Sequence, residues 1–281
     1  SKILKVKARQ VFDSRGNPTV EAEVFLDNGV SSTAIAPSGA STGAYEAYEL
    51  RDLDENSFLG KSVNKAVNNI NNKISSKLKG MNPDDQEMVD KTLIDLDGSE
   101  NKKNLGANAI LAVSLANSKC SALQNDRSLY KNFGNNFSFP LPLMNIINGG
   151  AHADNGLRIQ EFMIRPDRAK SFTEAMRICF LVINNLRKII KSKGLSTSVG
   201  DEGGFAPMIS SNNQALDLIV SAIKKSGFVN GKDVSICLDV AANELYKRNK
   251  YSIHSQNYIS AEKSINEYKK IIKKYNIKSI E

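Results

Sequence analysis

Four acidic residues stand where a carboxylate could take part in chemistry. Glu161 lies within an apolar run, Asp239 and Glu281 each follow one, and Glu202 lies in a glycine-rich loop. A carboxylate beside buried apolar chain is costly unless a cation or a proton compensates it. The chain has a formal net charge of +8, so these acids do not reflect a general acidic bias. Acids repeated at the ends of buried strands predict a metal site or an acid/base site.

The elements that would carry these acids can be read from hydrophobic spacing. Residues 19–26 alternate apolar and polar, Asp27-Asn28-Gly29 follows as a hairpin signal, and residues 30–36 form the return strand. Residues 61–78 carry apolar side chains at helical spacing, and residues 105–124 are rich in Ala and Leu, which predicts a largely buried helix. We expect a small α+β domain over residues 1–130, followed by a connection rich in turn residues.

The second domain is expected over residues 138–281. It opens with two strand-like runs, 143–148 and 157–164, with no helix between them. A helix capped by Ser171 and Glu174 then ends at Gly194. A helix over 213–226, a strand over 234–239, a helix over 260–275 and a strand over 277–280 follow. Strands alternating with helices predict an α/β fold with a parallel sheet or a barrel.

Composition restricts the class of protein. The chain is 41% hydrophobic and 24% charged, which is typical of a globular protein and argues against disorder. Its three cysteines are far apart, so they predict small buried side chains in a reducing compartment and no disulfide framework. No apolar stretch reaches membrane-spanning length. The lysines are dispersed without interleaved aromatic residues, so we expect a solvated surface and no nucleic-acid partner.

Seven motifs in order resemble the enolase family, phosphopyruvate hydratase, along the whole chain. They are Val11–Val20, Ala36–Gly43, Asn104–Ile110, Met144–His152, Ile159–Met163, Val199–Pro207 and Leu238–Ala242. The resemblance implies an α+β domain followed by a TIM-like barrel that opens β-β-α-α. It also implies a lyase that dehydrates 2-phosphoglycerate to phosphoenolpyruvate in glycolysis and gluconeogenesis, with Mg²⁺. Removing a proton beside the substrate carboxylate puts further negative charge on that carboxylate. In enolase-superfamily sites, magnesium ions stabilise the resulting ene-diolate.

The resemblance implies three metal ligands. Asp239 matches the first and Glu281 the second, and oxygen ligands suit magnesium. Ser41 matches the ligand of a second, substrate-linked magnesium, carried on a mobile loop. Taken alone, Asp239 could instead cap the next element, Glu281 could be a surface acid, and the Ser41 loop could be an ordinary connection.

The same resemblance assigns the remaining site residues. Glu202 matches the general acid that helps to expel the hydroxyl group, which requires a raised pKa. Glu161 and Gln160 match substrate-contacting residues, and His152 matches a contact on a flexible lid loop. Two successive strand residues point to opposite faces, so a shared ligand for Gln160 and Glu161 implies a local distortion. Gln160 could also be a buried structural amide, and Glu202 a surface turn acid.

None of the lysines matches the family's catalytic base, and a third metal carboxylate is also unmatched. We therefore expect residues 1–281 to be an incomplete, truncated barrel that is inactive by itself. The competing hypotheses are a naturally truncated, non-catalytic binding protein and an acid-sugar member of the wider superfamily. By resemblance, the full-length protein should be a cytoplasmic homodimer or higher oligomer, with cell-surface presence as a secondary location.

Overall fold

The chain folds as two units, Ser1–Phe137 and Ser138–Glu281, in a computed structural model that describes residues 1–39, 42–253 and 257–281. The first unit starts with three antiparallel strands, β1 (Ile3–Phe12), β2 (Pro18–Leu26) and β3 (Ser31–Ala36), in the order β1-β2-β3. The expected hairpin is therefore confirmed, with Val20, Ala22, Val24 and Leu26 buried on one face of β2.

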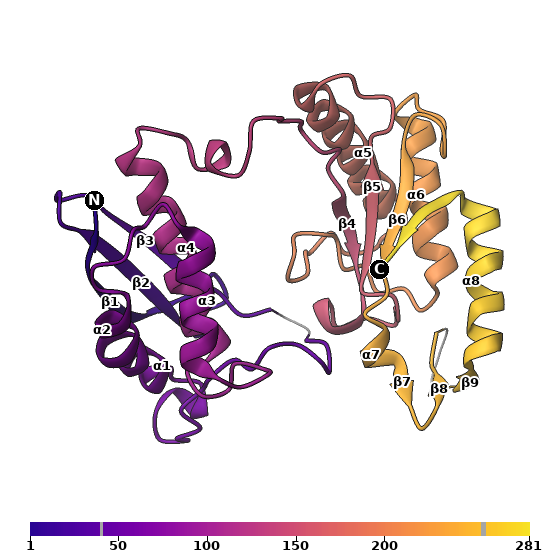
Figure 1. The fold of residues 1–281 in the computed structure, drawn as a ribbon. Helices are drawn as coiled ribbons and strands as arrows, with labels where there is room; N and C mark the ends of the chain where they lie inside the picture. The colour runs from indigo at the N-terminus through magenta and orange to yellow at the C-terminus, as the bar shows by residue number, and fades with distance from the viewer. Residues whose placement is uncertain (40–41, 254–256) are drawn as a thin grey trace. The chain divides into compact units, whose positions relative to one another are not determined.

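Helices cover this sheet in the first unit (Figure 1). One helical run contains α1 (Asn64–Asn68), a π-helical turn (Asn69–Ile74) and α2 (Ser75–Leu78). The buried residues of this run recur at every fourth position and are Ala66, Ile70, Ile74 and Leu78. The π-helical turn has more residues per turn than an α-helix, so this spacing stays on one face. The helix α4 (Ala107–Gln124) packs on β2 and β3, as its Ala-rich sequence predicted. The helix α3 (Gln86–Asp97) was not predicted.

The second unit contains a four-stranded sheet with the order β10-β6-β5-β4. Its strands are β4 (Met144–Asn148), β5 (Glu161–Arg165), β6 (Ser235–Asp239) and β10 (Ile277–Ile280). The strand β5 is antiparallel to both β4 and β6, whereas β10 and β6 are parallel. The strand β5 therefore departs from the parallel pattern, because no crossover helix separates it from β4. The sheet does not close into a barrel within the described residues.

Three amphipathic helices pack against this sheet, with α6 between α5 and α8 (Figure 1). They are α5 (Phe172–Ser192), α6 (Asn212–Lys225) and α8 (Ala261–Tyr275), within a few residues of the predicted ranges. Ser171 Oγ accepts a hydrogen bond from the Glu174 backbone, as the capping box predicts. The Glu174 carboxylate accepts from the Lys170 N–H. The apolar faces of α5, α6 and α8 pack with the strands into one hydrophobic core, and this packing supports the strand ends.

A short helix and a small sheet complete the second unit. They are α7 (Ala242–Leu245) and the antiparallel strands β7 (Tyr246–Lys247), β8 (Lys250–Tyr251) and β9 (Ile259–Ser260). Within the described part of the chain, no helix combines the length and apolar character needed to cross a membrane.

Candidate active site

The antiparallel direction of β5 brings three acids to one edge of the sheet. Glu161 is the first residue of β5 and Asp239 the last of β6, and the two are paired in the ladder. Glu281 directly follows β10 and is hydrogen-bonded to β6 on both sides: its N–H donates to Leu238 O and its carbonyl accepts from Val240 N–H. The start of one strand and the ends of two others therefore meet at this edge.

Glu202 and His152 reach the same place from two loops. His152 ends a short 3-10 turn, Gly150–His152, just after β4. Its Nδ1 lies 3.4 Å from Glu161 Oε1, and its Nε2 lies 3.9 Å from Glu202 Oε1. His152 and Glu161 are buried, whereas about half of the Glu202 side chain is exposed. His152, Glu161 and Glu202, which were predicted to act on substrate, thus lie around one small space.

The Glu161 carboxyl is strongly perturbed. Burial, a hydrogen bond with Glu202 and the charges of Glu202, Asp239 and Glu281 raise the pKa of Glu161 to about 8. All of these charges are carboxylates. A proton kept by Glu161 lowers the negative charge of the cluster. The sequence analysis did not anticipate this shift at Glu161; it led us to expect one at Glu202.

Gln160 holds Asp239 in place. Its Nε2 donates to Asp239 Oδ2 at 3.1 Å, while Asp239 Oδ1 accepts from the Ala241 N–H at 2.8 Å. The Gln160 backbone N–H also donates to Asp239 O. Gln160 precedes the first residue of β5, so regular strand alternation does not apply to it. A ligand shared by Gln160 and Glu161 stays a prediction.

Two sets of groups at this edge could hold a cation. His152, Glu161 and Glu202 offer ligand atoms that all lie within 4.8 Å of one another. Among the described residues, the buried His152 Nδ1 has no hydrogen-bond partner, because its 3.4 Å approach to Glu161 is not a hydrogen bond. Asp239 and Glu281 form the second set, on neighbouring strands. The second set offers only oxygen, which suits magnesium better than a set that includes imidazole.

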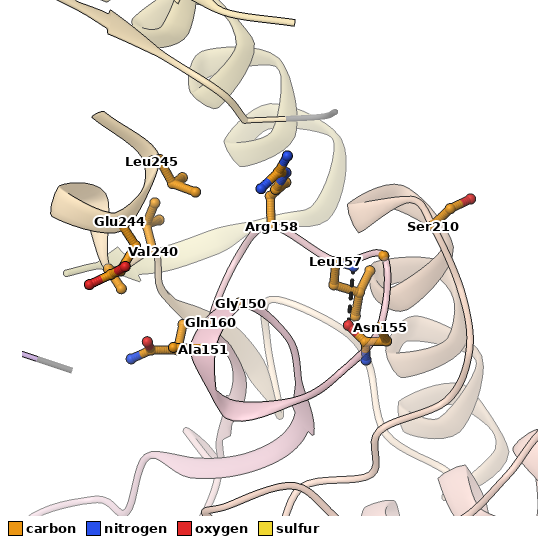
Figure 2. Close-up of a pocket in the computed structure, with 12 residues that line it drawn as sticks. Gly150, Ala151, Asn155, Leu157, Arg158, Gln160, Ser210, Val240, Glu244 and Leu245 are labelled. Carbon is orange, nitrogen blue, oxygen red and sulfur yellow. Dashed lines mark hydrogen bonds between the residues drawn. The ribbon is translucent and has the colours of Figure 1, made fainter. Parts of the chain in front are cut away.

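A cavity of about 530 Å³ adjoins the acidic cluster (Figure 2). Gln160 lines this cavity and is hydrogen-bonded to Asp239 of the cluster. Arg158 and Glu244 give its wall one cationic and one anionic side chain, and Ser210 lies on the opposite side of the view from Gln160. Neither Arg158 nor Glu244 was singled out from the sequence. The available signal for Arg158 was its position directly before the motif Ile159–Met163, two residues before Gln160.

Two residues of the enolase-like motifs Val11–Val20 and Ala36–Gly43 belong to the first unit. Ser41 lies outside the described residues. Arg15 belongs to the unit Ser1–Phe137, where its guanidinium donates to the carbonyl of Ser38.

Comparison with known proteins identifies the family. The model of the enolase N-terminal domain matches residues 3–133, and that of the enolase C-terminal TIM barrel domain matches residues 136–281. The chain belongs to the enolase family. It is 69% identical over 283 residues to an enolase of Pelagibacter ubique (strain HTCC1062), covering 100% of this chain and 68% of that relative. It is 50% identical over 285 residues to an enolase of Corynebacterium kroppenstedtii, covering 100% and 66%. The chain thus spans about two thirds of the length of these enolases.

Proposed function

We propose that this chain, within a complete enolase, catalyses the magnesium-dependent dehydration of 2-phosphoglycerate to phosphoenolpyruvate in glycolysis and gluconeogenesis. The observation that carries the proposal is geometric: Glu161, Asp239 and Glu281 meet at one end of the sheet, and His152 and Glu202 reach the same place from two loops. Without a cation, burial and the neighbouring carboxylates raise the pKa of Glu161 to about 8. Catalytic clefts are where burial and like charges perturb the pKa of carboxyl groups in this way. The family membership supplies the substrate class.

Asp239 and Glu281 are the proposed magnesium ligands. Each oxygen of Asp239 accepts one hydrogen bond, so the carboxylate is held in orientation while lone pairs remain for a cation. Backbone hydrogen bonds with Leu238 and Val240 hold Glu281, the residue after β10, beside the end of β6. When bound, magnesium would neutralise negative charge that develops on the substrate carboxylate. Ser41 is proposed as a further ligand, on the family resemblance alone.

Glu202, Glu161 and His152 are assigned to the substrate. Dehydration removes a proton from the carbon beside the carboxylate and expels hydroxide from the next carbon. Glu202 is accessible to solvent and would protonate that hydroxide, which leaves as water. Glu161 lies beside His152 and Glu202 and would contact substrate from the buried side of this space. His152 would contact substrate through its ring nitrogens, and Gln160 would keep Asp239 oriented. None of the lysines in residues 1–281 matches the family's lysine base. We therefore assign the base to the part of the complete enolase that these residues do not include.

The direct test uses a completed chain, in which residues 1–281 are joined to the remaining part of the Pelagibacter ubique enolase. The completed chain should form phosphoenolpyruvate from 2-phosphoglycerate when magnesium is added. Residues 1–281 alone should form none. Absence of turnover in the completed chain, with magnesium present and the fold intact by circular dichroism, would contradict the proposal.

Location and assembly are proposed on weaker ground. Cys120, Cys179 and Cys237 are free and buried, which fits a protein of the reducing cytoplasm. A homodimer or higher oligomer follows from the family resemblance. Light scattering on the completed chain would measure its mass, and a monomer would contradict the proposed assembly.

A further inference from the structure

The loop that carries Glu202 is fastened to the end of β4. The Asn148 N–H donates to Phe205 O at 2.9 Å, and the Phe205 N–H donates to Ile146 O at 3.0 Å. On the other side of Glu202, the Asp201 N–H donates to the carbonyl of His152 at 3.1 Å. The backbone on both sides of Glu202 is therefore tied to the strand end and the turn that position His152.

The side chain of Asn148 fills the space beneath this loop. Asn148 is fully buried, and a Cβ built on Gly204 would overlap its Oδ1. A Cβ built on Gly200 would overlap the carbonyl oxygen of His152 most closely and would also lie 2.9 Å from the Asn148 Cβ and 3.0 Å from its Cγ. Neither glycine adopts a left-handed φ, whereas Gly203 does, at 81°. At positions 200 and 204 glycine is thus required by close approach and not by backbone conformation.

We propose that Asn148 is a positioning residue, which sets the place of Glu202 by filling the space against Gly204. The proposal depends on the role given to Glu202 under the proposed function. About half of the Glu202 side chain is exposed, so its own packing cannot fix it, and its backbone must. Displacement of a catalytic group by about 1 Å can cost roughly 100-fold in rate. The tight contact between Asn148 and Gly204 prevents such a displacement.

The contact predicts a compensating pair of substitutions. Gly204→Ala alone should force the loop away, because its new methyl group overlaps Asn148. In residues 1–281, we expect amide hydrogen exchange at Asp201 and Phe205 to accelerate by roughly 10- to 100-fold, as overpacking of a filled site implies. Asn148→Ala together with Gly204→Ala should restore slow exchange, because the methyl group enters the space that the amide leaves.

Gly200→Ala provides the matched control. Its methyl group meets the backbone carbonyl of His152 and the Cβ of Asn148 most closely, and Asn148→Ala removes neither atom. The pair Gly200→Ala and Asn148→Ala should therefore stay nearly as fast as Gly200→Ala alone. If Asn148→Ala does not fold, Asn148→Ser replaces it, since it also removes the oxygen that Gly204 would meet. Equal rescue at both glycines, or rescue at neither, would overturn the proposal.

Kinetics of the completed chain separate a positioning role from a merely structural one. Gly204→Ala should lower kcat by roughly 100-fold with magnesium affinity unchanged, and the paired substitution should recover at least roughly tenfold. Rescue of exchange without rescue of kcat would refute the link to Glu202. If the completed chain with native sequence is inactive, the proposed function fails, and the exchange data alone decide whether Asn148 positions the loop.

Discussion

Replacing Glu161 by Gln should stabilise the metal-free chain progressively as pH rises. The pKa of Glu161 is raised from its ordinary value of 4.5 to about 8, chiefly by burial and by Glu202. Below about pH 4.5 the carboxyl is protonated in both the folded and the unfolded state, so it adds no penalty. Between those two values the unfolded chain releases the proton while the folded chain keeps it, and stability falls as pH rises. Above about pH 8 the penalty is constant.

The size of this effect follows from the shift. Each pKa unit corresponds to about 1.4 kcal/mol, so an upper bound is on the order of 5 kcal/mol. Glu202 is one cause of the shift, so the titration belongs to the pair, and part of the penalty remains when one member is replaced. We expect Glu161→Gln to gain roughly 2–4 kcal/mol relative to the native chain on going from about pH 4.5 to about pH 9.

Urea unfolding of residues 1–281, followed by far-ultraviolet circular dichroism with a chelator present, measures this difference; the chain has no Trp for fluorescence. Glu262→Gln is the matched control, an exposed acid in the first turn of α8, where surface substitution changes stability by about 0.5 kcal/mol or less. Parallel pH profiles for the native chain and Glu161→Gln would refute the account of the acidic cluster. So would a difference that shrinks as pH rises.

Three further predictions concern the metal, the acid and the open edge. Asp239→Asn in the completed chain should weaken magnesium binding by roughly 10- to 100-fold, because a neutral amide is a poorer ligand; unchanged affinity by calorimetry would make Asp239 structural. Glu202→Gln should lower kcat by roughly 10²- to 10⁴-fold and leave magnesium affinity intact, and near-normal turnover would remove Glu202 from the mechanism. In residues 1–281, Ile280→Lys should reduce aggregation measured by light scattering, because β10 is an edge strand of the sheet and a lysine blocks edge-to-edge pairing. Equal scattering by the native chain would place the aggregating surface elsewhere.

Much of the scaffold could be predicted from local patterns. Hydrophobic spacing gave the long helices, because their buried faces repeat at helical intervals and their caps are local. The turn signal Asp27-Asn28-Gly29 gave the β2–β3 hairpin for the same reason. The missed helix α3 has apolar residues at helical spacing, with Val89 and Leu93 buried. Its N-cap, Asp85, accepts from Met88 N–H and was also visible as a local signal.

The site depends on features that local patterns do not contain. Glu161 meets Asp239 only because β5 runs antiparallel, and strand direction is set by long-range pairing. The raised pKa of Glu161 comes from residues up to 120 positions away in the sequence, such as Glu281. Asn148 resembles an ordinary turn residue in the sequence, and its contact with Gly204 appears only in three dimensions.

The most direct measurement of the central claim is phosphoenolpyruvate formation, followed side by side for residues 1–281 and for the completed chain. Both are given 2-phosphoglycerate and magnesium after removal of any host enolase. The account predicts turnover by the completed chain and none by residues 1–281, whose acids and His152 cannot supply the missing base. Turnover by residues 1–281 alone, or a folded completed chain that leaves 2-phosphoglycerate unchanged, would contradict it.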